Sequence, residues 1–203
     1  MKARELTISG AWEFTPESHH DDRGVFVNPY VARAVAAAVG HPIDLVQTNH
    51  SVSRRGTVRG VHYALVPPGQ AKYVYCPAGA VLDIVVDIRV GSPTFGQHDA
   101  VRLDTVDYRA IYLAEGLGHV AVALEDGSLL SYLCSSAYDP EREKGTNPLD
   151  PALGLQWPAD LDLLLSPRDR SAPTLAEAAA QGLLPTYDDC VALYATLDAA
   201  RHR

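Results

Sequence analysis

Short runs in which apolar and polar residues alternate follow one another through the middle of the chain. A period of two is typical of a strand with one buried face, and turn residues separate the runs. Many short strands at this spacing predict an all-β sandwich or barrel. The predicted strands are Val46–Val52, Val58–Leu65, Lys72–Cys76, Val81–Val90, Ala100–Leu103, Ala110–Leu113, His119–Leu124 and Leu129–Cys134.

The two ends of the chain add short helices to this β-rich middle. The alanine-rich run Val31–Val39 predicts a helix, because Gly40 and Pro42 follow it as stop signals. The other expected elements are a first strand at Leu6–Phe14, a polar loop at His19 and His20, a turn at Asp21–Gly24, an apolar run at Val25–Val27, a loop-like stretch after Pro148, and helices at Leu175–Gln181 and Tyr187–Leu197.

The run from Val81 to Arg89 shows the alternation most clearly. Its apolar face is expected in the core and consists of Leu82, Ile84, Val86 and Ile88. The opposite face carries Asp83, Val85, Asp87 and Arg89. We expect this charged face to be solvated, with Asp83 facing a polar cavity as the alternative.

A second strand, Val58–Tyr63, brings a titratable group toward a cavity. Strict alternation places Val58, Gly60 and His62 on one face and Arg59, Val61 and Tyr63 on the other. The turn at Pro67-Pro68-Gly69 then returns the chain so that Lys72 begins the next strand. His62 is therefore either a proton-transfer group beside a cation or a barrel-interior histidine bonded to a carbonyl.

Composition narrows the classes of partner. The 203 residues suit one domain over 1–203 with a sizeable core. A net charge of −8 argues against nucleic-acid or anionic-membrane binding, although a local basic pocket would suit a small anionic ligand. Three scattered cysteines, no apolar N-terminal segment and no run of membrane-spanning length predict a cytoplasmic protein.

Metal ligands and other reactive groups are not evident from spacing alone. His62 is followed by Tyr63-Ala64 where metal-binding cupins usually have a second histidine, and His98 and His119 lack partners at ligand spacing, so no metal is expected. Taken alone, Tyr132 is expected to be a tyrosine of the core or the rim, and Arg168-Asp169-Arg170 is expected to be an exposed run of charges.

A ligand with a pyrophosphate and a base would need a different set of groups. Planar guanidinium groups can each donate two hydrogen bonds to phosphate oxygens, and amides can bond to a base. Residues of these types in the chain are Arg23, Gln47, Asn49, Ser51 and Arg59.

A set of motifs matches one family in order along nearly the whole chain. The matching segments are Asp22–Gly24, Val46–Ser51, Val58–Tyr63, Pro68–Tyr73, Leu82–Arg89, Gly91–Gly96, Gly118-His119, Tyr132–Cys134, Tyr138–Glu143, Trp157-Pro158 and Leu165–Asp169. In these the chain resembles the dTDP-4-dehydrorhamnose 3,5-epimerase family of RmlC-like cupins.

The resemblance implies a mainly β fold, a cupin jelly-roll barrel with short helices near the N-terminus and at the C-terminus. It also implies a homodimer formed by exchange of N-terminal strands. The implied substrate is a dTDP-4-keto-6-deoxyhexose from rhamnose or antibiotic-sugar biosynthesis, inverted at C3, C5 or both through an enolate. No cofactor is expected, because the C4 ketone is the electron sink.

The resemblance also implies a role for individual residues. His62 matches the general base, Asp169 the carboxylate that orients it, Tyr132 the acid on the other face, and Lys72 the cation near the enolate oxygen. Asp83 is expected to act indirectly behind these groups. The implied substrate-binding residues are Arg59 and Arg168 for the pyrophosphate, Arg23 reaching in from a partner subunit, Gln47, Asn49, Phe26 and Tyr138 for thymidine, and Ser51, His119 and Glu143 for the rest of the substrate.

Two stretches depart from the family pattern. They are Val25–Tyr30 and Val120–Val122. In the family, the corresponding positions lie beside the sugar or the nucleotide entrance. Which of C3 and C5 is inverted therefore stays open. A cupin 3,4-ketoisomerase, which need not keep His62, Asp169 and Tyr132 together, and a sugar-nucleotide-binding cupin without activity remain the alternatives.

Overall fold

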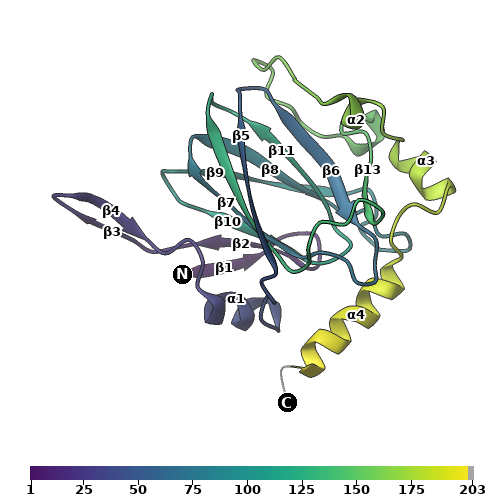
Figure 1. Cartoon of the computed structure of the whole chain (residues 1–203), viewed down its shortest axis with the longest axis horizontal. Coiled ribbons are helices and arrows are strands. Elements are labelled where there is room, and N and C mark those ends of the chain that lie inside the picture. The colour runs from purple at the N-terminus through teal and green to yellow at the C-terminus, as the bar shows by residue number, and fades with distance from the viewer. Residues whose placement is uncertain (201–203) are drawn as a thin grey trace.

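The computed structural model describes residues 1–200, and two antiparallel β-sheets facing each other form its body (Figure 1). The six-stranded sheet has the order β1 (Lys2–Glu5), β2 (Ala11–Thr15), β10 (Ala110–Leu113), β7 (Lys72–Ala78), β12 (Ser128–Cys134) and β5 (Gln47–Ser53). The five-stranded sheet has the order β13 (Glu143–Gly145), β6 (Val58–Ala64), β11 (Gly118–Ala123), β8 (Ala80–Val86) and β9 (His98–Asp104). A separate hairpin of β3 (Ser18–Asp21) and β4 (Gly24–Val27) extends away from the sheets (Figure 1).

The helices are short and lie at the periphery. They are α1 (Ala32–Val39), the 3-10 helix η1 (Pro151–Leu153), α2 (Pro167–Arg170), α3 (Leu175–Ala180) and α4 (Tyr187–Ala200). The positive φ of Gly40 ends α1, and a capping box between Thr174 and Glu177 begins α3. None of the helices within residues 1–200 is long and apolar enough to cross a membrane.

Apolar side chains form two cores, one on each face of the five-stranded sheet. The first lies between the sheets and includes Phe14, Tyr73 and Leu103. The second lies under the C-terminal segment, where Ile84 and Val86 of β8 meet Leu153, Leu175 and Leu184. Both faces of this sheet are therefore covered.

The predicted mainly β class with short peripheral helices is confirmed, and so are the helices at α1, α3 and α4. The single strand Leu6–Phe14 is wrong. Gly10, with φ of 88°, lies in a turn that separates β1 from β2. The polar loop at His19 and His20 is wrong too, because both residues lie in β3 and pair with β4.

The solvated charged face expected for Val81–Val90 is also wrong. β8 ends at Val86, and Asp83, Asp87 and Arg89 are all buried. The reason for Asp83 is that its face of β8 turns inward, between the sheets. Asp87 and Arg89 follow the strand and are covered by the β1–β2 turn and by α4.

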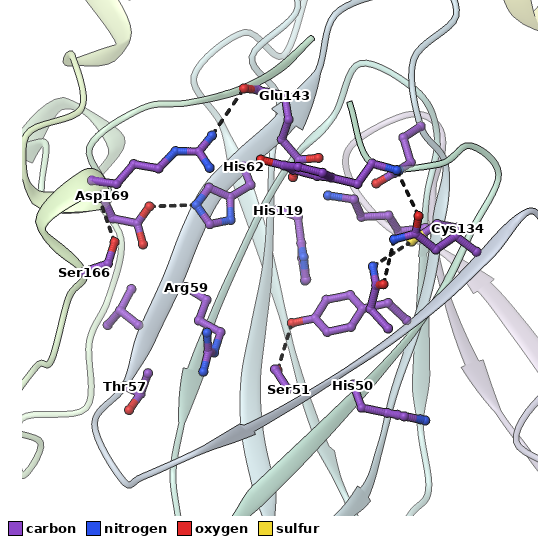
Figure 2. Close-up of a pocket in the computed structure, with 18 residues that line it drawn as sticks. His50, Ser51, Thr57, Arg59, His62, His119, Cys134, Glu143, Ser166 and Asp169 are labelled. Carbon is purple, nitrogen blue, oxygen red and sulfur yellow. Dashed lines mark hydrogen bonds and ion pairs between the residues drawn. The ribbon is translucent and has the colours of Figure 1, made fainter. Parts of the chain in front are cut away.

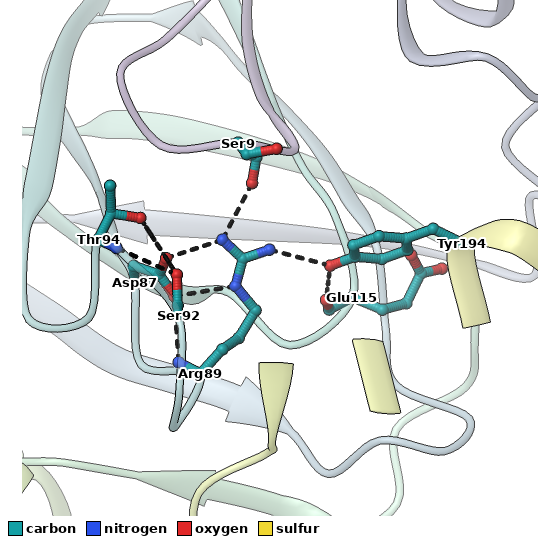
Figure 3. A network of polar contacts seen from close by, with 7 residues as sticks. All are labelled: Ser9, Asp87, Arg89, Ser92, Thr94, Glu115 and Tyr194. Carbon is teal, nitrogen blue, oxygen red and sulfur yellow. Dashed lines mark hydrogen bonds and ion pairs between the residues drawn. The ribbon is translucent and has the colours of Figure 1, made fainter. Parts of the chain in front are cut away.

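Asp87 and Arg89 are buried because they satisfy each other (Figure 3). The Arg89 guanidinium donates to both carboxylate oxygens of Asp87, at 2.9 and 2.8 Å, and to the Ser9 carbonyl at 3.1 Å. Ser92 and Thr94 hydroxyls each donate to Asp87 at 2.6 Å. These hydrogen bonds hold the pKa of Asp87 below its usual range against the opposing effect of burial. Arg89 also donates to the Tyr194 hydroxyl of α4 at 3.4 Å, so the network connects α4 and the β1–β2 turn to the barrel.

We expect Arg89→Met to lower the free energy of unfolding by about 3–5 kcal/mol, because Asp87 would remain buried without its counter-charge. Arg4→Met is the matched control, since Arg4 pairs with Glu13 on the exposed surface, and it should cost under about 1 kcal/mol. Urea unfolding of both variants measures the difference. Equal losses would show that the buried network does not stabilise the fold.

Candidate active site

A cavity of about 470 Å³ opens between the two sheets (Figure 2). Its walls come from β5, β6, β7, β11, β12 and the start of β13, together with the loop around Tyr138 and the start of α2. Most of the residues predicted for substrate binding or catalysis lie here. They are Gln47, Asn49, Ser51, Arg59, His62, Lys72, His119, Tyr132, Tyr138, Glu143, Arg168 and Asp169.

His62 and Asp169 form a hydrogen-bonded pair in the wall of the cavity. His62 Nε2 donates to Asp169 Oδ1 at 2.7 Å, which leaves Nδ1 of the ring with a lone pair. The side chain of His62 is 26% exposed and that of Asp169 is 8% exposed. Burial would raise the pKa of Asp169, but the hydrogen bond and charge of His62 hold it below its usual range. An ionised carboxylate fixes the ring and stabilises it when it gains a proton.

The short helix α2 places Asp169 beside His62. Ser166 caps the helix, because its hydroxyl accepts a hydrogen bond from the Asp169 amide at 3.0 Å. Pro167 occupies the first turn, where its missing N–H costs nothing. The expected exposed charge run at Arg168-Asp169-Arg170 is therefore a capped helix with a buried aspartate.

A β-bulge at Gly60 brings His62 and Arg59 to the same cavity. In the pairing of β6 with β11, His62 lies opposite His119 and Arg59 opposite Ala121, so β6 has one residue more than its partner. The strict alternation predicted for β6 is wrong for this reason. Gly60 has φ of 125°, and a Cβ there would lie 2.3 Å from the His119 carbonyl oxygen. Only glycine fits this position without displacing β11.

Tyr132 and His119 lie together on another wall. Their rings meet edge to face with centroids 5.8 Å apart. The hydroxyl of Tyr132 is 3.4 Å from Ser51 Oγ, and burial raises its pKa to about 12, so it stays protonated at neutral pH. His119 Nε2 donates to the fully buried Asp83 at 2.8 Å, which agrees with the indirect position expected for Asp83.

Lys72 lies at the start of β7, and its side chain is directed to the cavity. The residue is 9% exposed and makes no side-chain hydrogen bond or ion pair within the described residues 1–200. Its ammonium group can therefore contact a ligand without breaking an existing pair. A cation in such a water-poor position acts strongly on negative charge that develops nearby.

The outer part of the cavity offers guanidinium and amide groups. Arg59 donates to Ser53 Oγ at 3.0 Å, and Arg168 to the Glu143 carbonyl at 3.2 Å. Gln47 donates to Asn49 at 2.7 Å and accepts from the Tyr138 amide at 3.0 Å. The guanidinium groups of Arg59 and Arg168 suit phosphate oxygens, and the side-chain amides of Gln47 and Asn49 suit the edge of a base.

Arg23 and Phe26 are not part of this cavity. Both lie in the β3–β4 hairpin, where the Arg23 side chain is 90% exposed and pairs with Asp21, and Phe26 is 65% exposed. Within one chain the hairpin points away from the barrel (Figure 1). Within one chain, therefore, neither residue lies where its predicted contact with the substrate could form.

Some lining residues were not singled out from the sequence. Gln70, Cys134 and Ser166 lie in the cavity wall, and Gln70 donates to the Ser136 carbonyl at 2.8 Å. The run Ser166-Pro167-Arg168-Asp169 carries a helix-start signal that could have placed Ser166 and Asp169 together. Within residues 1–200 no group of three His, Cys, Asp or Glu side chains is arranged to hold a metal ion.

The family model described as dTDP-4-dehydrorhamnose 3,5-epimerase matches residues 5–177. The chain belongs to this family. A dTDP-4-dehydrorhamnose 3,5-epimerase of Mycolicibacterium smegmatis is 55% identical over 97% of both chains. Membership confirms the family predicted from the motifs and makes the chain an epimerase.

Solved structures of family members agree with the fold. The rmlC epimerase of Mycobacterium tuberculosis superposes with a TM-score of 0.94 at 47% identity, over 97% of this chain and all of that one. ChmJ, a 3'-monoepimerase from Streptomyces bikiniensis in complex with dTDP-quinovose, has the same TM-score and identity over 96% and 98% of the two chains. The predicted RmlC-like jelly roll is confirmed.

We expect Gly60→Ala to destabilise the fold more than the matched variant Gly24→Ala. Gly24 has nearly the same φ, 129°, but no atom lies within 4 Å of a Cβ there. Each variant carries backbone strain of about 1–3 kcal/mol, and Gly60→Ala adds a collision with β11. Thermal unfolding of both variants measures this, and equal loss would mean that β6 and β11 separate freely at the bulge.

Proposed function

We propose that this chain inverts C3, C5 or both of a dTDP-4-keto-6-deoxyhexose through an enolate, with His62 as base and Tyr132 as acid. The observation that carries the proposal is the convergence of three groups on one cavity. These are a histidine held by a carboxylate, a protonated tyrosine, and a lysine without a protein partner. ChmJ in its complex with dTDP-quinovose supports a dTDP-sugar as the ligand.

The chemistry begins with the C4 ketone, which acidifies the C–H bonds at C3 and C5. His62 removes one such proton through Nδ1, and Asp169 stabilises the imidazolium that forms. Negative charge moves to O4, where the Lys72 ammonium stabilises it. Tyr132 then returns a proton to the opposite face of the carbon. The ketone accepts the electrons throughout, so the proposed reaction needs no redox cofactor.

The nucleotide would occupy the outer part of the same cavity. Arg59 and Arg168 offer guanidinium groups to the pyrophosphate, and Gln47 and Asn49 offer amides to the thymine edge. Ser51, His119 and Glu143 would contact the sugar side of the ligand, and Tyr138 would cover the base.

We also propose that the chain acts as a homodimer in which the β3–β4 hairpin of one subunit completes the cavity of the other. Arg23 and the exposed apolar ring of Phe26 are too far out on the hairpin to serve their own cavity. β5, whose inner face carries Gln47, Asn49 and Ser51, is the edge strand of its sheet, and Val46 just before it and Val52 within it are exposed. An added hairpin would cover this edge.

His62→Ala should lower turnover by about a hundredfold or more, the usual effect of removing a general base. Asp169→Asn should also slow turnover, because the imidazolium loses its stabilising charge. The assay is conversion of dTDP-4-keto-6-deoxyglucose in deuterated water followed by NMR, which also identifies the carbons that exchange. His98→Ala on β9, outside the cavity, is the control. Near-normal rates for His62→Ala would refute the mechanism.

Tyr132→Phe should lose epimerised product much more than it loses deuterium uptake. His62 alone can remove and return a proton on one face, which gives exchange without inversion. Inversion needs a donor on the opposite face, and Phe removes only the hydroxyl while conserving volume. Equal loss of exchange and product would assign Tyr132 to binding or to the enolate. Full retention of both would assign the acid role to another group.

Mixing two inactive variants tests the shared cavity. In a hybrid of Arg23→Ala and His62→Ala subunits, one of the two cavities has an intact His62 and receives an intact Arg23 from its partner. If the variants exchange subunits at random, about a quarter of all cavities regain both residues. Activity should therefore return on mixing. No recovery, in mixtures shown by mass spectrometry to contain hybrids, would place Arg23 in its own cavity.

A further inference from the structure

Gln70 lies in the wall between the catalytic cavity and an adjoining cavity of about 410 Å³. The two cavities have Gln70, Tyr138 and Glu143 in common. Gln70 is 8% exposed, so most of its side chain is enclosed by protein. The mechanism proposed above gives this residue no role, and a buried amide next to a catalytic cavity needs an explanation.

Two serines that follow β12 hold the segment before β7 in place. The backbone of Ala71 accepts from the Ser135 amide at 3.0 Å and donates to Ser135 Oγ at 2.8 Å. Ser136 Oγ donates to the Gly69 carbonyl at 3.1 Å, and Gln70 Nε2 donates to the Ser136 carbonyl at 2.8 Å. The side-chain amide of Gln70 is therefore fixed by the protein itself.

The partners of Gln70 Nε2 determine which way this amide faces. The Ser136 carbonyl can only accept, and Ser136 Oγ, whose proton goes to Gly69, also accepts from Nε2 at 3.3 Å. Ser136 lines the adjoining cavity and not the catalytic one, so the nitrogen is directed to the adjoining side. Oε1 makes no hydrogen bond within residues 1–200, yet it is not fully buried. We infer that Oε1 is an accessible acceptor on the side of the catalytic cavity.

The place of Gln70 in the fold indicates which part of the ligand meets this acceptor. Gln70 and Lys72 both line the cavity where β7 begins. β12 lies between β7 and the edge strand β5, which carries the proposed base contacts Gln47 and Asn49. Gln70 is therefore on the inner side of the cavity with Lys72, where the proposed function puts the sugar.

The proposed sugar has two hydroxyls, at C2 and C3. Inversion at C3 would carry its hydroxyl to the other face of the ring, whereas C2 keeps its configuration throughout. An amide fixed by the protein keeps its hydrogen bond only to a hydroxyl that does not move. We therefore propose that Gln70 is a specificity-determining residue, whose Oε1 accepts from the C2 hydroxyl and selects sugars that carry it over 2-deoxy sugars. This assignment rests on the proposed dTDP-sugar substrate.

The test compares the binding of dTDP-6-deoxyglucose (dTDP-quinovose) and its 2-deoxy counterpart, dTDP-2,6-dideoxyglucose, by isothermal titration calorimetry. Both ligands lack the C4 ketone, so binding is measured without epimerisation. The unmodified protein should bind the 2-hydroxy ligand about fivefold or more tightly, because the 2-deoxy ligand leaves the Gln70 acceptor without its partner.

Gln70→Met removes the acceptor and nearly conserves the length of the side chain. It should weaken binding of the 2-hydroxy ligand about fivefold or more and leave the 2-deoxy ligand nearly unchanged. Gln156→Met is the matched control and should alter neither affinity, since Gln156 also donates to a backbone carbonyl, that of Gly154 at 2.9 Å, but is exposed and outside the cavity. If Gln70→Met does not fold, Gln70→Asn, which withdraws the amide by one methylene, should show the same selective loss.

A loss of affinity shared equally by both ligands would assign Gln70 to the structure of the cavity wall and overturn the proposal. An unchanged preference for the 2-hydroxy ligand in the variant, or no preference in the unmodified protein, would overturn it as well. Binding of neither ligand would refute dTDP-sugar recognition altogether. Binding with the expected preference, but without turnover of dTDP-4-keto-6-deoxyglucose, would refute only the proposed epimerisation and leave the role of Gln70 supported.

Discussion

The one-residue bulge at Gly60 is the constraint on which the cavity depends. Without it, Arg59 and His62 would point to opposite faces of β6, and only one of them could reach a ligand between the sheets. With it, both line the cavity while Val61 and Tyr63 still pack in the core on the other face. The close approach of Gly60 to the His119 carbonyl also ties this arrangement to β11, which carries His119. The single bulge at Gly60 therefore determines how the side chains of both β6 and β11 are placed in the walls of the cavity.

Two buried carboxylates beside the cavity are held by histidines on other elements. Asp169 comes from α2 to His62 on β6, and Asp83 comes from β8 to His119 on β11. The pair of Asp87 and Arg89 plays no part in ligand contact and instead secures α4. Lys72, in contrast, makes no side-chain hydrogen bond or ion pair within residues 1–200, which leaves its ammonium group available to a ligand in the cavity.

The periodicity of apolar residues predicted most strands and helices correctly, because most strands have one face toward a core and therefore follow a period of two. It failed where the backbone departs from regularity or where polar residues are buried in pairs. The turn at Gly10 and the bulge at Gly60 interrupt the strand geometry, although the alternation of apolar and polar residues in the sequence continues through both positions. The pairing of Asp169 with His62 joins positions far apart in sequence, so only the family motifs predicted it. Arg23 and Phe26 were predicted to contact the substrate, but within one chain the β3–β4 hairpin holds both outside the cavity.

In the proposed mechanism, the number of inverted centres depends on how the substrate is held rather than on the number of catalytic groups. The proposed mechanism uses one histidine base and one tyrosine acid, on different walls of the cavity. His119 is bonded to a carboxylate through Nε2 in the same way as His62, but its side chain is 6% exposed against 26% for His62, and its ring packs against Tyr132. Inversion at both C3 and C5 therefore requires the sugar ring to present each carbon in turn to the same pair. A cavity wall that fixes the ring in one pose would limit the reaction to one carbon. Val120–Val122, where the chain departs from the family pattern, does not supply such a wall, because Val120 and Val122 are buried in the core under the C-terminal segment and do not line the cavity.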